Sequence, residues 1–375
     1  MIWSFLACFA ETDKQAVPTE KAQRPDIVLV VVDTLRFDRL EIFGNSRTSL
    51  PTADRLAKEG LWFSRAYAQS GWTLPSFVSM WTGTYPHQHR VGRNPKDDKE
   101  FGSLPESTTT LAESLQEVGY ATGAVINNTF LAPAFGLAQG FDDYLYQGAD
   151  NTDLRSAEQT SKDALTWLEK QKKPSFMVVH YMEPHMHLDP KPAFRGVFAP
   201  KMEKPPVPIP FMTEHAFKMT QKDRTPVQMD YIFGLYDEEV WAVELGLRNL
   251  IDGIKKRGTW ENTVFIITSD HGEEFWDHGK FEHGHSLMGI LTHIPLIVYG
   301  PSFKGKGKVR TLVEHVDLYQ GILSLAGAKS PEDTMGEDLF SLLQAEDAER
   351  WSISENTLYG GPQVSIMSPR HRLVL

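Results

Sequence analysis

The feature that most constrains the fold is the run Ile-Val-Leu-Val-Val-Val at residues 27–32, which ends at Asp33. An uninterrupted β-branched run is typical of a strand buried on both faces of a parallel sheet, because a half-exposed strand would alternate with polar residues. Comparable apolar runs occupy 121–126, 175–180, 263–268 and 295–299. Helical periodicity marks 53–59, 111–118, 157–170 and 236–256. This alternation predicts an α/β fold, a doubly wound sheet with helices on both faces.

The longest predicted helix, 236–256, has an apolar stripe at spacings of three and four, formed by Val240, Val243, Leu247, Leu250 and Ile254. Its acidic residues, Asp237, Glu238, Glu239 and Glu244, are predicted to lie on a solvent-exposed face. The Pro-rich passage 200–210 has no periodicity, so it is predicted to be a surface loop or an insertion near the mouth of a site.

Composition excludes several classes of protein. A hydrophobic fraction of 41% and a charged fraction of 23% are those of a globular chain, which excludes disorder and fibres. A formal net charge of -11 argues against nucleic-acid binding, because phosphate contacts are made largely by Lys and Arg. The one cysteine, Cys8, excludes an intramolecular disulfide.

Cys8 lies in a short apolar stretch, residues 2–10, which a polar segment follows. This order resembles the end of a bacterial lipoprotein signal. We therefore expect residues 1–24 to be a signal-like or disordered segment and Cys8 to be a candidate site for a lipid anchor. Export to the periplasm, the cell surface or the medium is the expectation, and a cytoplasmic location stays open. No other apolar stretch is long enough to span a bilayer.

Polar residues fall where predicted strands end. Asp33 follows the first strand, and Asp270 and His271 follow the strand at 263–268. In open α/β sheets, ligands gather at the carboxyl ends of strands. Carboxylates and imidazole suit Mn²⁺, Zn²⁺, Ca²⁺ or Mg²⁺. Asp33 alone would be interpreted as a helix cap, but in combination these residues favour a metal site.

Several ordered motifs extend this interpretation. They occupy residues 25–36, 56–63, 70–76, 82–89, 140–142, 183–185, 269–273 and 283–287. In this order they resemble the sulfatase branch of the alkaline-phosphatase superfamily. The resemblance implies an alkaline-phosphatase-like fold with a catalytic domain over residues 25–330. It also implies a C-terminal subdomain over residues 331–375 that is small or truncated, with a few strands and a helix.

Thr73 stands where this family places its nucleophile. Sulfatases have Cys or Ser there, which is oxidised to formylglycine. Threonine cannot give that aldehyde, so no formylglycine is expected. The resemblance implies that Asp33, Asp270 and His271 bind a divalent cation that also holds the Thr73 oxygen. Such a cation would lower the pKa of the hydroxyl and make an alkoxide available.

The resemblance also assigns roles to residues near the predicted metal site. His185, and one of His283 and His285, match positions that contact substrate or protonate the leaving group. Asn127 and Asn128 are candidates for substrate binding, or for a turn after the strand. His187 is a candidate for substrate binding. A two-metal variant with Glu183, His187 and either His283 or His285 stays open.

Departures from the sulfatase pattern favour phosphorus chemistry. Val32 replaces one of two paired Asp residues, and Phe77 replaces an Arg that helps to fix the modified nucleophile. We expect a metal-dependent hydrolase or transferase of phosphate, phosphonate or sulfate esters, with phosphorus esters favoured. The expected partner is a small-molecule, glycan or lipid ester and not a nucleic acid. The alternative is a catalytically inactive sulfatase-like protein that binds anionic glycans or lipids.

Overall fold

The computed structural model describes residues 24–47, 49–94, 97–148, 154–345 and 349–375, so Cys8 and nearly all of the signal-like segment lie outside the described residues. A nine-stranded sheet forms the centre, in the order β12-β2-β11-β8-β1-β7-β5-β6, with β13 paired to β2. The strands are β1 (Asp26–Val32), β2 (Leu61–Tyr67), β5 (Ala121–Asn127), β6 (Asp143–Gln147), β7 (Ser175–Tyr181), β8 (Thr263–Thr268), β11 (His293–Tyr299), β12 (Gly307–Val309) and β13 (Val313–Glu314).

The predicted α/β fold with a doubly wound sheet is confirmed, but the sheet is mixed. Strands β6, β5, β7, β1 and β8 are parallel, whereas β11 is antiparallel to both β8 and β2. The connection from β8 to β11 contains only the hairpin of β9 (Glu274–Phe275) and β10 (Phe281–Glu282) and the short α8 (Gly289–Thr292). Without a crossover helix, the chain re-enters the sheet in the opposite direction.

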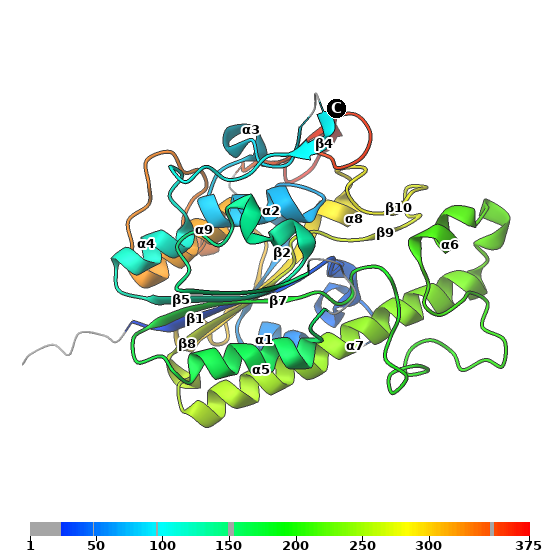
Figure 1. Cartoon of the computed structure of the whole chain (residues 1–375), viewed down its shortest axis with the longest axis horizontal. Helices are drawn as coiled ribbons and strands as arrows, with labels where there is room; N and C mark the ends of the chain where they lie inside the picture. Colours follow the sequence, from blue (N-terminus) through cyan, green and yellow to red (C-terminus); the bar gives the residue numbers. More distant parts are fainter. Residues whose placement is uncertain (1–23, 48, 95–96, 149–153, 346–348) are drawn as a thin grey trace, which may run out of the picture.

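Helices cover both faces of the sheet (Figure 1). One face carries α1 (Pro51–Glu59), α5 (Ala157–Leu168) and α7 (Pro226–Arg257), and the other carries α2 (Thr73–Thr82), α4 (Leu111–Glu117) and α9 (His315–Ala326). Side chains of β1 alternate between the two cores, so that Val30 belongs to one and Val31 to the other. All seven residues of β1 are buried, which explains why the strand has no polar alternation.

Two elements differ from the sequence-based expectation. Helix α7 begins at Pro226 rather than Tyr236, because Thr225 and Gln228 form a capping box in front of it. Residues 61–67, which are not among the predicted apolar runs, form strand β2. The remaining short elements are α3 (Pro86–His89), β3 (Arg93–Asn94), β4 (Asp97–Phe101), α6 (Thr213–Lys218), β14 (Ser352–Glu355), β15 (Val364–Met367) and β16 (Arg372–Val374).

The predicted exposed acidic face of α7 is wrong. Asp237, Glu238, Glu239 and Glu244 are all buried. The loop before α6 covers this face, and three of its backbone N–H groups donate to Glu238 Oε1, at 2.6 to 3.2 Å. Glu244 accepts from the Thr52 amide and hydroxyl, at 2.9 and 2.7 Å. Backbone and hydroxyl donors thus replace water around carboxylates on the buried side of the helix.

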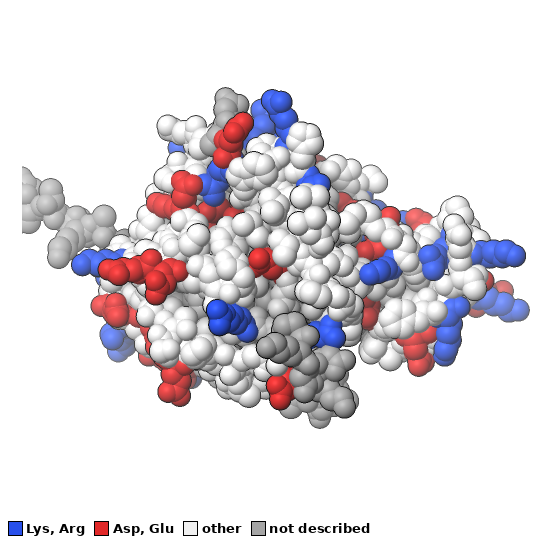
Figure 2. Space-filling view, turned by 90° about the horizontal axis from the view of Figure 1, so that it is seen from above, with Lys and Arg blue, Asp and Glu red and all other residues white. Residues whose placement is uncertain are grey.

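Residues 182–224 and the start of α7 form an arm at one end of the molecule, which carries α6 (Figure 1). Within it, residues 200–210 contain no helix or strand, which confirms the predicted loop. Figure 2 shows Lys and Arg side chains gathered at this end. None of the helices in the described ranges has the length and apolar character that a membrane span requires.

The C-terminal strands β14, β15 and β16 form an antiparallel sheet, and the chain after β14 packs against the segment before α2. Ser70 Oγ donates to the Asn356 carbonyl at 2.8 Å, and Trp72 Nε1 donates to Asn356 Oδ1 at 3.2 Å. Leu358 N donates to the Gly284 carbonyl at 2.7 Å. The last residues therefore form one wall around the segment that carries Thr73.

Glu314 joins this wall to the main sheet. Its buried environment is expected to make the stability of the protein depend on pH. Its carboxylate accepts hydrogen bonds from Gln69, Tyr85 and the Ile353 amide, and burial, together with Asp317, raises its pKa to about 8. An acid whose pKa is raised by folding contributes stability below its unfolded pKa and loses it as pH rises through the folded value. The free energy of unfolding of each protein is compared at pH 5 and pH 8. We expect the decrease from pH 5 to pH 8 to be about 2 kcal/mol larger in the parent than in Glu314→Gln. Urea unfolding of both proteins at the two pH values measures this difference. An equal decrease in the free energy of unfolding in the two proteins would contradict the prediction.

Candidate active site and metal site

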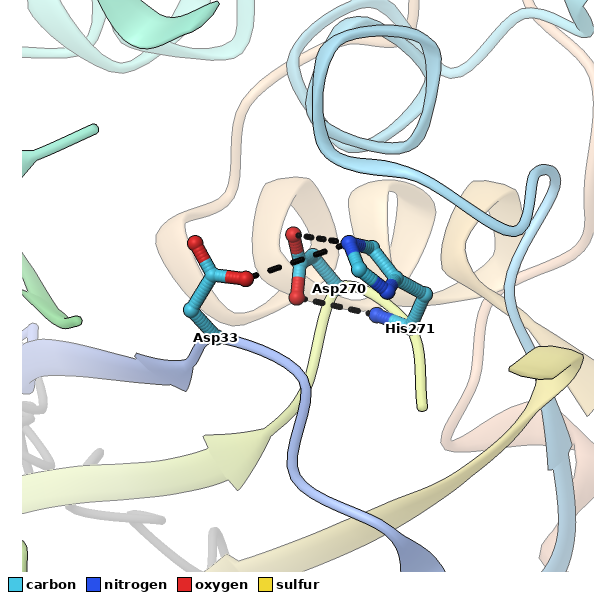
Figure 3. Close-up of side chains that lie close together, drawn as sticks. All are labelled: Asp33, Asp270 and His271. Carbon is cyan, nitrogen blue, oxygen red and sulfur yellow. Dashed lines mark hydrogen bonds and ion pairs between the residues drawn. The ribbon is translucent and has the colours of Figure 1, made fainter. Parts of the chain in front are cut away.

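Three candidate metal-ligating residues meet at the carboxyl ends of two neighbouring strands (Figure 3). Asp33 follows β1, and Asp270 and His271 follow β8, which pairs in parallel with β1. One ligand atom from each residue lies within 4.8 Å of the others, and all three residues are fully buried. The parallel pairing of β1 and β8 thus brings together residues that are far apart in sequence.

The free atoms of this cluster fit a cation. His271 Nδ1 faces the Gly272 carbonyl at 2.9 Å, so the ring proton sits on Nδ1 and Nε2 has a lone pair. That lone pair faces Asp270 Oδ2 at 3.3 Å and Asp33 Oδ1 at 3.8 Å. Both carboxylate oxygens are buried without a hydrogen-bond donor. Three facing acceptor atoms in a buried space repel one another unless a cation lies between them.

The second oxygen of Asp33 is held by donors from neighbouring strands. Asn128 Nδ2 donates to Asp33 Oδ2 at 2.7 Å. His180 Nδ1 accepts from the Asn127 amide at 3.3 Å, which leaves the proton on Nε2, 3.3 Å from Asp33 Oδ2. Burial alone would raise the pKa of Asp33, but His185, His180 and His271 outweigh it and lower the pKa. Burial and Asp33 together raise the pKa of Asp270.

The turn after β1 has an unusual backbone. Thr34 has φ of 56°, the left-handed region that β-branched residues seldom adopt. Its amide donates to Asp270 Oδ1 at 3.2 Å, and its carbonyl accepts from the Tyr236 hydroxyl at 2.7 Å. The strained turn is therefore held from both sides, by a ligand residue and by the long helix α7.

Thr73 is the first residue of α2 and lies against the cluster. Its Oγ1 is 3.3 Å from His271 Nε2, and the residue is 1% exposed. The first amides of a helix have no partner within the helix, and its N-terminal end favours negative charge. The fold thus places the Thr73 hydroxyl beside a candidate cation site and at the positive end of a ten-residue helix.

Of the two histidines left open by the sequence, the structure brings His283 to the cluster. Its ring centre is 4.5 Å from that of His271 and 5.0 Å from that of His185. His283 Nδ1 is 3.1 Å from Glu273 Oε1. His285 Nε2 instead faces the Glu282 carbonyl at 3.0 Å. His185 Nδ1 donates to the Met186 carbonyl at 2.7 Å.

The other candidates lie apart from the cluster, except Asn128. Asn127 Nδ2 donates to the His180 carbonyl at 2.6 Å and to Thr160 at 3.0 Å, so it links β5 to β7 and α5. Glu183 Oε1 accepts from the Ala157 amide at 3.1 Å, and His187 is exposed. In the described part of the chain, the Asp33, Asp270 and His271 group is the one arrangement with metal-site geometry.

Two residues of the site, His180 and Glu273, have no predicted role in the sequence. Both were visible at predicted strand ends, because His180 ends an apolar run and Glu273 follows Asp270 and His271 within the same motif. Both are fully buried. What the sequence could not supply was their partners, Asp33 and His283, which come from other strands.

A substitution at Gly272 would test the packing of the loop that carries Asp270 and His271. A Cβ at this position would lie 2.0 Å from the Ile290 carbonyl oxygen, which is backbone and cannot move aside cheaply. We expect Gly272→Ala to lower the free energy of unfolding by about 2 kcal/mol or more and to weaken metal binding, since the preceding residue is His271. Gly361→Ala, where a Cβ would meet nothing within 4 Å, is the control. Urea unfolding of both variants measures the effect, and an equal change in the two would contradict it.

Comparison with known proteins places this geometry in context. The family model described as Sulfatase matches residues 25–328. Arylsulfatase K of Canis lupus familiaris is 26% identical over 365 residues, which cover 85% of this chain and 66% of the relative. N-acetylglucosamine-6-sulfatase of Capra hircus is 25% identical over 393 residues, which cover 93% and 68%. The chain thus spans about two thirds of the length of these curated relatives.

Solved structures share the fold. A phosphonate monoester hydrolase of Agrobacterium radiobacter has a TM-score of 0.74 at 19% identity, over 94% of this chain and 87% of its own. A protein solved with its substrate D-glucosamine-2-N,6-O-disulfate has a TM-score of 0.72 at 19% identity, over 94% and 88%. At these identities the likeness concerns the fold alone.

Proposed function

The chain belongs to the sulfatase family, and from this premise we propose that it is a metal-dependent hydrolase or transferase of phosphate, phosphonate or sulfate esters with Thr73 as its nucleophile. We favour phosphorus esters of small molecules, glycans or lipids. The observation that carries the proposal is the position of Thr73 Oγ1, 3.3 Å from His271 Nε2 and beside two buried carboxylates.

Asp33, Asp270 and His271 would hold the divalent cation, which supplies a Lewis acid when bound and lowers the pKa of a neighbouring hydroxyl. Their oxygen and nitrogen donors suit Mn²⁺, Zn²⁺, Ca²⁺ or Mg²⁺. Asn128 donates a hydrogen bond to Asp33 from the opposite side, and His180 Nε2 lies 3.3 Å from the same oxygen, so this carboxylate would be oriented before any cation arrives.

Different residues carry out the nucleophilic attack and the protonation of the leaving group. Thr73 Oγ1, once deprotonated, attacks phosphorus or sulfur, and the bond to the leaving alcohol breaks. The N-terminal amides of α2 favour the negative charge at this point. The covalent Thr73 ester is then hydrolysed by water or transferred to an acceptor alcohol.

Proton supply to the leaving group is the role that we propose for His283 and Glu273. Burial and His185 lower the pKa of His283 to about 4, while burial is the main cause that raises the pKa of Glu273 to about 8. In the metal-free fold both shifts favour the uncharged forms, and Glu273 Oε1 lies 3.1 Å from His283 Nδ1. His283 Nε2–H can donate to the leaving oxygen while Nδ1 accepts the proton of Glu273.

Phe77 supports the preference for esters with a single negative charge. Its ring lies edge-on against His180 at 5.3 Å and against Trp81 at 5.1 Å. An apolar ring therefore stands where the sulfatase pattern has an Arg, close to the residues that orient Asp33. Fewer cationic groups favour a monoanionic phosphodiester or phosphonate monoester over a dianionic phosphate monoester.

A matched series of nitrophenyl esters tests this function. The protein is stripped with chelator and assayed with added Mn²⁺ or Zn²⁺ against the phosphate monoester, phosphodiester, phosphonate monoester and sulfate. We expect metal-dependent turnover, with the phosphodiester or phosphonate monoester fastest. Hydrolysis of the sulfate alone would contradict the assignment of Thr73. Metal binding without turnover of any ester would identify an inactive sulfatase-like binding protein.

A further inference from the structure

A cleft of about 600 Å³ opens between α6 and the β9–β10 hairpin, beside His283. His283 belongs both to this cleft and to the cluster, because its ring centre is 4.5 Å from that of the ligand His271. A leaving group bonded to an atom beside His283 would therefore lie next to this cleft. The cleft lining includes Phe217, Arg224, Trp276, Lys280 and Phe281.

The wall of this α6–β10 cleft is aromatic. The rings of Trp276 and Phe281 pack with centres 4.6 Å apart, and Phe217 on α6 is 71% exposed. Trp276 has φ of 60°, a conformation that bulky residues rarely adopt, and its amide closes the hairpin on the Lys280 carbonyl at 2.7 Å. Strained backbone of this kind is concentrated at ligand sites. The wall offers flat apolar surface to a ring.

The cleft also contains cationic groups, and one of them has an unused donor. Arg224 lies over the Trp276 ring at 4.7 Å. Its Nε is buried and has no hydrogen-bond partner within the described residues, while Nη2 donates to the Met219 carbonyl at 3.3 Å. Lys280 is exposed, and its Nζ donates to the His285 carbonyl at 3.3 Å. A buried guanidinium N–H without a partner points to an anionic ligand group.

The arm around the cleft has an excess of positive charge, like the cleft itself. Residues 182–224 of the arm contain seven Lys or Arg and five Asp or Glu, whereas the whole chain has a formal net charge of -11. Figure 2 shows this excess of blue side chains at the end of the molecule that carries α6. Glu282, the acidic residue of the cleft lining, is engaged by the Thr213 hydroxyl. The arm therefore attracts an anionic group toward the cleft.

We propose that the α6–β10 cleft binds the leaving group of the substrate, and that this leaving group is a ring with an apolar face and a carboxylate or similar anionic substituent. The ring packs against Trp276, Phe281 and Phe217, and the anion binds Arg224 with support from Lys280. This assignment rests on the proposed function, because the cleft is a leaving-group site only if chemistry occurs beside His283. An aromatic acid and an acidic sugar share the required chemistry.

Binding of leaving-group analogues to the full chain tests the proposal without turnover. Isothermal titration calorimetry compares 4-hydroxybenzoate with its neutral isostere 4-hydroxybenzamide, and glucuronate with glucose. In at least one pair we expect the acid to bind tenfold or more tightly than its neutral partner. The pair that shows this preference identifies the aromatic or the sugar source. Equal binding within both pairs would overturn the proposal.

Three variants locate the effect. Arg224→Met should abolish the preference for the acid, and Phe217→Ala, at a mostly exposed position, should weaken both members of the pair about fivefold. Lys222→Met, on the same arm but outside the cleft lining, is the matched control and should change neither affinity. Retention of the full preference in Arg224→Met would overturn the assignment.

Acid preference and ester hydrolysis, both measured on the parent protein, separate this inference from the proposed function. A preserved preference for the acid in a parent protein that hydrolyses no ester would contradict the catalytic proposal and leave an anionic-ring binding site. Hydrolysis of esters with no preference for the acid would contradict the leaving-group site alone.

Discussion

Replacement of Thr73 by alanine is expected to lower kcat for the phosphonate monoester by about 10⁴-fold or more, the scale seen when a covalent nucleophile is removed. The reason is positional, because Thr73 Oγ1 is the hydroxyl that lies 3.3 Å from His271 Nε2 in a fully buried cluster. Thr73→Ser keeps the hydroxyl and should retain activity within about tenfold, since only a methyl group is lost. Initial rates with saturating metal measure both variants.

Two controls make the alanine result specific. Thr166→Ala removes an exposed threonine of α5 and should leave kcat unchanged. Metal-dependent thermal stabilisation should persist in Thr73→Ala, because Asp33, Asp270 and His271 remain. Turnover by Thr73→Ala within tenfold of the parent would exclude Thr73 as the nucleophile.

Asp270→Asn is expected to weaken metal binding without lowering the stability of the metal-free protein. The variant should lose most of the metal-induced rise in melting temperature, with a fall in kcat of about 10³-fold, because one anionic ligand is gone. In chelator, however, it should be at least as stable as the parent at pH 8. Burial and Asp33 raise the pKa of Asp270, so its ionised form is disfavoured in the metal-free fold.

The pH dependence follows from the same shift. A carboxyl with a raised folded pKa contributes stability at low pH, and that contribution disappears as pH rises through the folded pKa. The metal-free parent should therefore lose more stability between pH 5 and pH 8 than metal-free Asp270→Asn. Thermal unfolding in chelator and in Mn²⁺ at both pH values measures this. A variant that keeps the full metal-induced shift would contradict the assignment of Asp270 as a ligand.

The strands next to the site could be predicted from sequence because they are buried on both faces. The apolar runs that predict β1, β7 and β8 match the observed strands to within one residue at each end. These strands are parallel neighbours, so residues at their carboxyl ends lie close together. For this reason the sequence alone could predict that Asp33, Asp270 and His271 form one site. The family resemblance added Thr73, which follows no predicted strand.

Other features depend on contacts that no local pattern encodes. The direction of β11 is set by the connection through the β9–β10 hairpin, and an apolar run looks the same in either direction. Glu238 is buried because a loop some forty residues away donates three amides to it. The choice between His283 and His285 depends on the turn at Gly284, whose φ of 76° directs the two side chains differently.

The most direct test of a threonine nucleophile is to trap the covalent intermediate. The metal-loaded protein is quenched with acid during steady-state turnover of the phosphonate monoester, and the peptide that spans residues 66–90 is sequenced by mass spectrometry. The account predicts the mass of the phosphonyl group on Thr73, and no adduct on that peptide in Thr73→Ala. Turnover with Thr73 unmodified at every quench time, or with the adduct on another residue, would contradict it.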